Sequence, residues 1–203
     1  MITEIYQQSF PVLVINEDFI LREQSITDAE AFFNYYSMNP MVTRYILATK
    51  PASIKDAVSE IEYCRNLFYH KRGVYWSIAR RDNNQLIGAV GLYVNNHHHR
   101  AEICYDLSQE YWGKGLMTKA VSKVLDFTFS KIDMHRIEAL TMLENEASQA
   151  LLRKLGFVHE GMLRNYRYFQ NKSYDVQMFG ITQALYLENI EKPSSKLGIL
   201  AAV

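Results

Sequence analysis

Net charge, cysteine and long apolar runs are all scarce in this sequence of 203 residues. The 22 lysines and arginines balance 22 aspartates and glutamates, so no global field would attract nucleic acid or cationic substrates. Only two cysteines occur, Cys64 and Cys104, and they form no CxxC pair. The sequence therefore predicts free, buried thiols in a reducing intracellular compartment, and substrate choice by a local pocket.

The sequence also lacks the segments that direct a chain to a membrane. Residues 1–11 contain no basic region followed by an apolar core, which a secretory signal would have. No apolar run approaches the roughly 20 residues that span a bilayer. We therefore expect a cytoplasmic protein with no membrane partner.

Apolar residues are abundant, at 48% of the chain, and their pattern predicts one α/β domain over residues 1–190. Residues 191–203 contain Pro193 and Gly198 and are expected to form a C-terminal tail. Strand and helix signals alternate along the domain and predict a mixed sheet with helices on both faces. Strands are expected at 19–22, 75–79, 86–94, 101–107, 137–143, 157–168 and 175–181, with helices at 116–132 and 147–155.

Two further helices are predicted before the first hairpin. The segment 27–30 has the form of a capping box, so a helix should begin there, and Pro40 should end it. Ser53 followed by Asp56 should open the second of these helices, and Gly73 should stop it.

A glycine-rich turn, Gly113-Lys114-Gly115, precedes the helix expected at 116–132. Glycine permits unusual backbone conformations, and N–H groups at a helix N-terminus bind anions. The turn therefore favours a diphosphate site, although a plain turn is an alternative. A phosphate loop would need GxxxxGK before Ser or Thr, which is absent. A dinucleotide fingerprint is a poor match because Thr118 occupies the third glycine position, although Glu138 stands near the place of a ribose-binding acid.

Four segments, taken in order, resemble the GNAT acetyltransferases, and most closely the branch that acetylates N-terminal alanine or serine of ribosomal proteins. They are AEICYDL at 101–107, YWGKG at 111–115, HRIEA at 135–139, and the segment 145–161 that begins NEAS and ends LGFVHEG. The likeness covers roughly residues 19–187 and continues through Leu163-Arg164 and Asp175-Val176. Lys119 departs from the branch, which usually has glutamate there.

The resemblance implies a GNAT fold, with a mixed, mostly antiparallel sheet of about six to seven strands. It implies transfer of acetyl from acetyl-CoA to a protein N-terminal α-amine, without metal, by a monomer or homodimer. A polyamine, aminoglycoside or amino-sugar acceptor is an alternative, as is a non-catalytic acyl-CoA-binding regulatory domain. The implied acetyl-CoA residues are Tyr105, Leu107, Trp112, Gly113, Lys114, Gly115, Leu116, Met117, Thr118, Asn145 and Ser148.

Amide formation from a thioester needs a neutral amine, donors for the developing oxyanion and a proton for the thiolate. The resemblance implies Glu160 as the base, with Glu102 as its rival, and Ser148 as the proton donor. It implies that a backbone N–H near Leu107 polarises the carbonyl and that Asn145 contacts the pantetheine arm. Each side chain has a structural alternative: a strand-edge charge for Glu160, an ion pair for Glu102 and a helix-end hydroxyl for Ser148.

Two other features have simpler interpretations. His97, His98 and His99 are expected in a solvated loop, because adjacent residues cannot easily face one metal ion. The aromatic residues of the last two strands could line a substrate groove, but packing within the hairpin is favoured. They are Tyr166, Tyr168, Phe169 and Tyr174.

Overall fold

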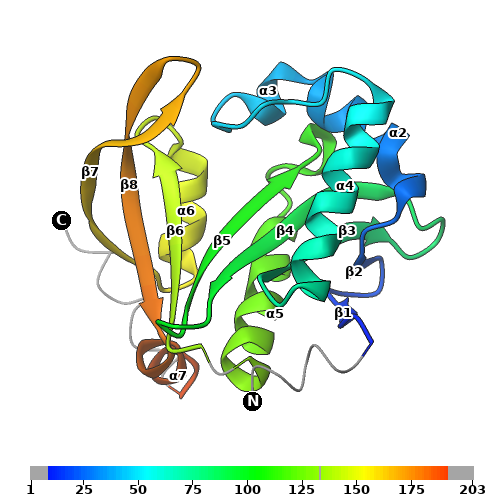
Figure 1. The fold of residues 1–203 in the computed structure, drawn as a ribbon. Coiled ribbons are helices and arrows are strands. Elements are labelled where there is room, and N and C mark those ends of the chain that lie inside the picture. The colour runs from blue at the N-terminus through cyan, green and yellow to red at the C-terminus, as the bar shows by residue number, and fades with distance from the viewer. Residues whose placement is uncertain (1–8, 133, 192–203) are drawn as a thin grey trace.

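A single eight-stranded sheet runs through the molecule, a computed structural model that describes residues 9–132 and 134–191 (Figure 1). The strand order is β1-β2-β3-β4-β5-β6-β8-β7, and every neighbouring pair is antiparallel except β5 with β6. The strands are β1 Leu13–Val14, β2 Phe19–Glu23, β3 Gly73–Arg80, β4 Leu86–Asn95, β5 Arg100–Leu107, β6 Arg136–Met142, β7 Val158–Phe169 and β8 Lys172–Thr182.

The predicted fold class is confirmed, and the sheet is one strand larger than expected. The extra strand is β1, whose two residues are too few to show the alternation that reveals a strand in sequence. The parallel pair β5–β6 is the one that lies between the two antiparallel halves, β1–β5 and β6–β8–β7.

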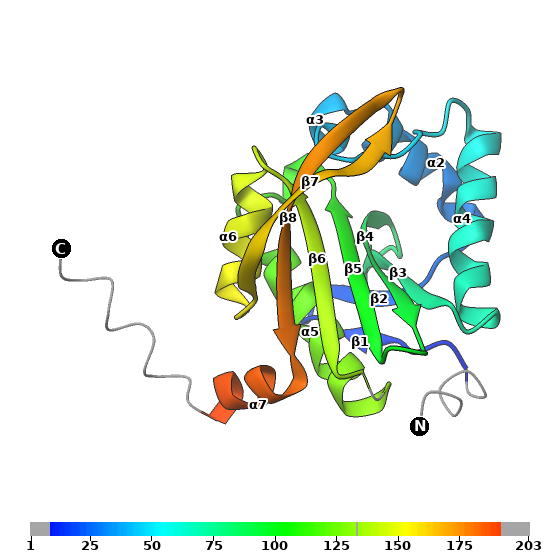
Figure 2. The same ribbon diagram turned by 60° about the vertical axis from the view of Figure 1, so that its left-hand side comes forward.

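Helices cover both faces of the sheet (Figures 1 and 2). One face carries α2 (Ala29–Phe32), α3 (Pro40–Thr43) and α4 (Ile54–Tyr69), and the other carries α5 (Leu116–Lys131) and α6 (Glu146–Lys154). A last helix, α7 (Gln183–Glu191), follows β8 and was not expected; Tyr186 anchors it by donating a hydrogen bond to Asp126. The predicted tail lies outside the described residues beyond Glu191.

The start and end of the first predicted helix need correction. Ser25, not Thr27, is the cap: its hydroxyl accepts from the Thr27 N–H, and the Asp28 carboxylate accepts from the Ser25 N–H. Both sites fit the same short pattern, so the sequence could not choose between them. Pro40 begins α3 instead of ending a helix, because proline fits the first turn. Ser53 caps α4 as predicted.

The main core lies between the sheet and α5 and links both halves. Trp76 and Leu92 from the first half, Leu125 from α5, and Ile137 and Phe179 from the second half are fully buried in one cluster. Within residues 9–132 and 134–191, no helix combines the length and apolar character needed to cross a bilayer.

Candidate active site

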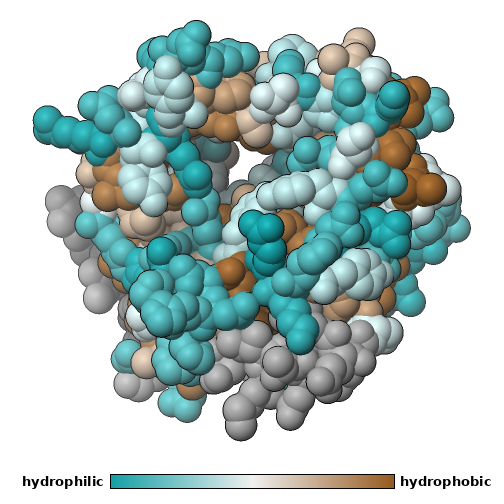
Figure 3. Space-filling model, in the orientation of Figure 1, coloured by the Kyte–Doolittle hydropathy of each residue, from teal (hydrophilic) through white to brown (hydrophobic). Residues whose placement is uncertain are grey.

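The strands β5 and β6 separate in the middle of the sheet. Their parallel pairing covers only three residue pairs and ends at Glu102 opposite Glu138. Beyond that point β6 pairs only with β8, and an opening forms between the two halves of the sheet. Figure 3 shows this opening as a hollow in the surface. The hydroxyls of Tyr105 on β5 and Ser148 on α6 lie 2.7 Å apart and bridge the two sides of this opening.

The backbone of β5 presents donors to the opening. The Ser108 N–H donates to the Ile87 carbonyl, and hydrogen-bonded pairs in an antiparallel ladder recur at every second residue. The backbone N–H of Asp106 therefore points toward β4, and the backbone N–H of Leu107 points to the opposite side, toward the opening. The Trp112 indole N–H donates to the Leu107 carbonyl at 2.8 Å, which agrees with this orientation. A thioester carbonyl in the opening could accept from the Leu107 N–H.

The glycine turn lies at the N-terminus of α5 and has empty space above it. Gly113 and Gly115 have φ angles of 71° and 72°, and a Cβ atom at either would meet nothing within 4 Å. The first N–H groups of α5 have no intrahelical acceptors, so they can bind a diphosphate together with the turn. Leu116 and Met117 are 5% and 8% exposed, so they can contribute only backbone N–H groups.

Three more of the predicted acetyl-CoA residues have defined places at the turn. Lys114 is exposed, with its ammonium 5.6 Å from the centre of the Tyr111 ring. Trp112 is 42% exposed and is anchored by its indole N–H. Thr118 is half-buried in the first turn of α5. The turn therefore fits the diphosphate through backbone donors, with Lys114 as the nearest mobile charge.

The sequence left open whether Ser148 caps α6 or serves the reaction, and the structure assigns the cap to Asn145. The Asn145 Oδ1 accepts from the Ser148 N–H at 3.2 Å and caps α6. The Ser148 hydroxyl bonds to Tyr105 at the opening. Burial raises the pKa of Tyr105, so this phenol stays protonated at neutral pH. Proton donation by Ser148 remains a prediction.

Glu160 lies away from the opening. Its carboxylate is held by the Arg136 guanidinium at 2.7 Å, at the end of β6 where β5 and β6 are still paired. The hydrogen bond from Arg136 lowers the pKa of Glu160, which weakens it as a base. The structure does not bring Glu160 together with Ser148. Its role as base stays a prediction that these surroundings disfavour.

Glu102, the rival base, is the last residue of β5 that pairs with β6, and it accepts a hydrogen bond from Arg167 of β7. This ion pair connects the first half of the sheet to the β7–β8 hairpin. The structural alternative that the sequence offered for Glu102 is therefore present, and its catalytic role also stays a prediction.

Asp106 is a candidate that the sequence reasoning missed. It lies on the face of β5 opposite Tyr105, and its Oδ1 accepts from the Tyr35 hydroxyl at 2.7 Å. Burial raises the pKa of Asp106 to about 7, which suits a general base at neutral pH. The alternation of a strand places Asp106 on the same face as Glu102, and this period could have identified it.

Other candidate features do not converge on the opening. No group of three or more histidine, cysteine or acidic residues could hold a metal ion in the part of the chain that the structure describes. Cys64 and Cys104 are free thiols. Tyr166 and Tyr168 are 52% and 71% exposed, whereas Phe169 and Tyr174 are half-buried, and packing of these rings within the hairpin stays a prediction.

Comparison with known proteins assigns the family. Residues 18–158 match the family model described as the acetyltransferase (GNAT) domain. The chain therefore belongs to the GNAT acetyltransferase family and is an acetyl-CoA-dependent N-acetyltransferase. It is 40% identical over 175 residues to the uncharacterized N-acetyltransferase YoaA of Bacillus subtilis strain 168, and the match covers 86% of this chain and 98% of YoaA.

Relatives with named acceptors match over shorter segments. The spermidine N(1)-acetyltransferase of Escherichia coli K12 is 33% identical over 111 residues, or 54% of this chain and 60% of that enzyme. The [ribosomal protein uS5]-alanine N-acetyltransferase of the same strain is 31% identical over 102 residues, or 48% and 53%. The predicted family is thus confirmed, while the ribosomal-protein branch stays a prediction.

Solved structures confirm the fold. The microcin C7 self-immunity acetyltransferase MccE, in complex with acetyl-CoA and AMP, superposes with a TM-score of 0.74. That match covers 83% of this chain and 94% of the other at 22% identity.

Proposed function

We propose that this enzyme transfers acetyl from acetyl-CoA directly to a protein N-terminal α-amine, in a ternary complex formed at the opening between β5 and β6. The observation that carries the proposal is the convergence of three features on this opening. The empty glycine turn can hold a diphosphate, the Leu107 N–H can polarise a carbonyl, and the Ser148 hydroxyl lies across the gap. Such an enzyme would work in the cytoplasm as one domain over residues 1–190, as a monomer or homodimer.

Acetyl-CoA supplies the activated thioester, and the chain supplies position, polarisation and protons. The turn and the first N–H groups of α5 orient the diphosphate, which aligns the pantetheine arm along the opening. The Leu107 N–H stabilises negative charge on the carbonyl oxygen. As the neutral amine nitrogen forms the new C–N bond and the C–S bond breaks, the Ser148 hydroxyl donates a proton to the departing sulfur, and the proton that the nitrogen loses restores the hydroxyl through solvent.

An α-amine is the favoured acceptor on chemical grounds. Its reference pKa is near 8, whereas that of a lysine side chain is about 10.4, so an α-amine loses its proton more easily near neutral pH. A relative named for ribosomal-protein alanine acetylation adds support. A small amine is the second candidate, because a relative of similar identity is named for spermidine.

A screen of acceptors tests the proposal. Acetyl-CoA is incubated with peptides that carry free N-terminal alanine or serine, with polyamines and with amino-sugars, and free CoA is measured. We expect turnover with the peptides and none with the same peptides blocked at the α-amine. Turnover only with the small amines would transfer the assignment to the second candidate. Acetyl-CoA binding without turnover of any amine would favour a regulatory domain.

A further inference from the structure

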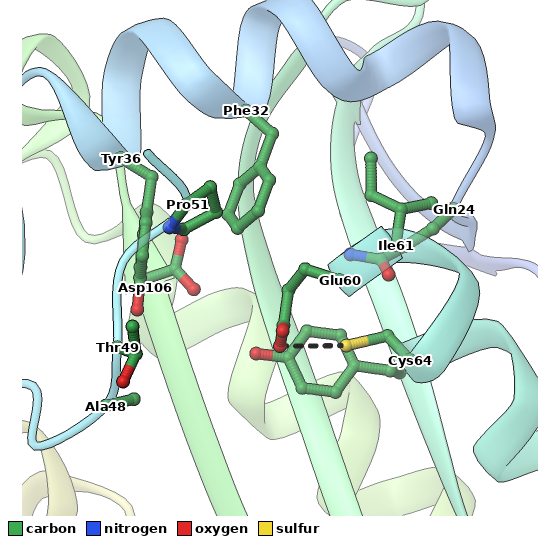
Figure 4. A pocket seen from close by; sticks show the side chains of 11 residues that line it. Gln24, Phe32, Tyr36, Ala48, Thr49, Pro51, Glu60, Ile61, Cys64 and Asp106 are labelled. Atoms are coloured by element: carbon green, nitrogen blue, oxygen red, sulfur yellow. Dashed lines mark hydrogen bonds between the residues drawn. The ribbon is translucent and has the colours of Figure 1, made fainter. Parts of the chain in front are cut away.

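A cavity of about 230 Å³ lies on the other side of β5 from Tyr105 and Ser148 (Figure 4). It is enclosed between β3 and β5 on one side and α2, the middle of α4 and the segment 48–51 on the other. Pockets for drug-sized ligands occupy about 300–1,000 Å³, so this cavity takes a smaller group. One amino-acid residue or one compact amine is a suitable occupant.

We infer that this cavity is the acceptor subsite: it binds the primary amine with the short group attached to it, and the Asp106 carboxylate takes the amine proton. This inference rests on the proposed function. It extends the proposal by assigning the base and by limiting the acceptor to an amine on a compact body.

The cavity offers oxygen acceptors to a cation. Gln24 is 5% exposed, and its Oε1 is buried without a hydrogen-bond partner in the described part of the chain. Leaving such an acceptor unpaired costs about 1–3 kcal/mol, so a bound N–H donor would relieve it. Glu60 lies at the exposed margin, and Asp106 lies on the strand side. Among residues 9–132 and 134–191, no lysine or arginine that would repel an ammonium lines the cavity.

Aromatic rings supply the remaining walls. Phe32 and Tyr36 line the cavity from the helical side, and Tyr75 lines it from β3. Such ring faces attract ammonium groups and pack against short aliphatic chains. Two carboxylates in separate parts of the lining, together with the aromatic rings, therefore select a cationic amine with a small apolar substituent.

Asp106 has one carboxylate oxygen available to the amine, and it is adjacent in the chain to Leu107. The Tyr35 hydroxyl occupies Oδ1, which leaves Oδ2 for the incoming N–H. Asp106 is adjacent to Leu107, whose N–H faces the opening, so an amine held by Asp106 lies beside the edge of β5 where the acetyl carbon is expected. Asp106 first takes one proton from the bound ammonium, which frees the nitrogen lone pair for attack on the carbonyl carbon. As the C–N bond forms and the C–S bond breaks, the nitrogen releases its second proton, which replaces the one that Ser148 gives to the sulfur.

The other titratable groups around Asp106 do not compete near neutral pH, apart from Glu60. They are Tyr35, Tyr36, Cys64, Tyr75 and Cys104. Burial raises the pKa of each of these tyrosines and thiols, so they remain neutral. Burial also raises the pKa of Glu60. The two carboxylates are therefore the groups that change charge with pH in this cavity.

The test compares Asp106→Asn with wild type in steady-state rate against pH, using the acceptor found in the screen. Asparagine can still accept from Tyr35, so the fold should persist. We expect kcat to fall roughly 10²–10⁴-fold at neutral pH and to recover as alkali makes the amine neutral. Acetyl-CoA affinity should be unchanged. Glu62→Gln, an exposed carboxylate on the same helix as Glu60, is the control and should keep the wild-type profile.

Two further variants keep the inference falsifiable if Asp106→Asn does not fold. Tyr35→Phe removes a hydrogen bond that lowers the pKa of Asp106, so the acid limb of the rate profile should move to higher pH. Gln24→Leu removes the unpaired oxygen, so KM for the amine should rise about tenfold with little change in KM for acetyl-CoA.

The outcomes separate this inference from the proposed function. Wild-type turnover with an unchanged Asp106→Asn rate would overturn the inference alone, and an alkali-rescued loss in Glu102→Gln or Glu160→Gln would move the base there. An unmoved profile in Tyr35→Phe would also count against it. Failure of the wild-type enzyme to acetylate any amine would instead overturn the proposed function.

Discussion

Three carboxylates could act as the base, and they differ in their immediate neighbours. Glu160 is held by Arg136 and Glu102 by Arg167, whereas Asp106 has the neutral hydroxyl of Tyr35. The Arg136 guanidinium lowers the pKa of Glu160 and so weakens it as a proton acceptor. Burial without a cation has the opposite effect. All three residues carry a carboxylate, so the contacts of each carboxylate decide which of them can accept a proton near neutral pH.

The free energy of unfolding should depend on the protonation of Asp106. Its pKa is about 7 in the folded protein and near 3.9 in the unfolded chain, so the folded state binds more protons between these values. Wild-type stability should therefore fall as pH rises through this window. Asp106→Asn lacks this loss and should gain about 1–2 kcal/mol relative to wild type from about pH 4 to about pH 8, a figure discounted for the solvent-connected cavity.

Urea unfolding of both proteins at several pH values measures this difference. Asp82→Asn, in an exposed pair with Arg80, serves as the comparison for a surface aspartate. A gap between wild type and Asp106→Asn that stays constant with pH would show that the carboxyl has an ordinary pKa.

Ser148→Ala should reveal a different type of loss from the one expected for the base. A thiol has a reference pKa near 8.5, so thiolate can leave without a proton, and we expect a rate decrease of about tenfold. Alkali should not restore the rate, because the missing proton is on the leaving group. Tyr105→Phe removes the hydroxyl partner of Ser148 and should have the smaller effect. Wild-type rates for Ser148→Ala at every pH would exclude the hydroxyl as proton donor.

At the scale of elements, the regular strands and long helices were predictable because their apolar periods are local. The segments 101–107 and 116–132 were placed within one residue of β5 and α5. The short elements were not predicted, since β1 has two residues and α3 has four, about one period of each pattern, and a single period shows no repeat. The separation of β5 from β6 is a tertiary feature that neither strand encodes alone.

Parts of the candidate site could likewise be predicted from local sequence, and other parts could not. The glycine turn was predicted from its own residues and Ser148 from the resemblance, because both lie in compact motifs. The cavity could not be predicted from local motifs, because Gln24, Glu60 and Asp106 come from three distant segments, and two of these segments lie outside the matched motifs. Their proximity follows from the packing of α2 and α4 on the sheet.

Gly115→Val tests the turn as the site of the diphosphate. No protein atom lies within 4 Å of the added Cβ, so the side chain would occupy the ligand's space, with backbone strain from the φ of 72°. We expect CoA affinity to fall at least about tenfold. The matched control is Gly161→Val, where φ is 143° and the surrounding space is also open, but on β7.

Calorimetric titration with CoA distinguishes the two variants. Equal affinity in Gly115→Val and wild type, with both proteins folded, would show that the turn is not the cradle. A loss of the same size in Gly161→Val would attribute the effect to backbone strain alone.

At the scale of the whole molecule, two half-sheets meet at one short parallel seam and open beyond it. The first half carries the cavity and the glycine turn, and the second half carries Ser148 on α6. The main core and the pair of Glu102 with Arg167 connect the halves. Figure 1 shows α5 and α6 on one face of the sheet and α2 and α4 on the other. In the proposed arrangement acetyl-CoA binds on the first of these faces, the amine binds on the second, and both meet at the edge of β5.

Thermal unfolding in the presence of nucleotides tests the central claim that this opening binds acetyl-CoA. A ligand that binds only the folded state stabilises it by about 2.7 kcal/mol at about 100 times its Kd. We predict that acetyl-CoA and CoA raise Tm in a concentration-dependent way for the wild type, and much less for Gly115→Val. NAD and ATP should produce much smaller shifts. A rise in Tm with NAD and none with acetyl-CoA or CoA would contradict the account.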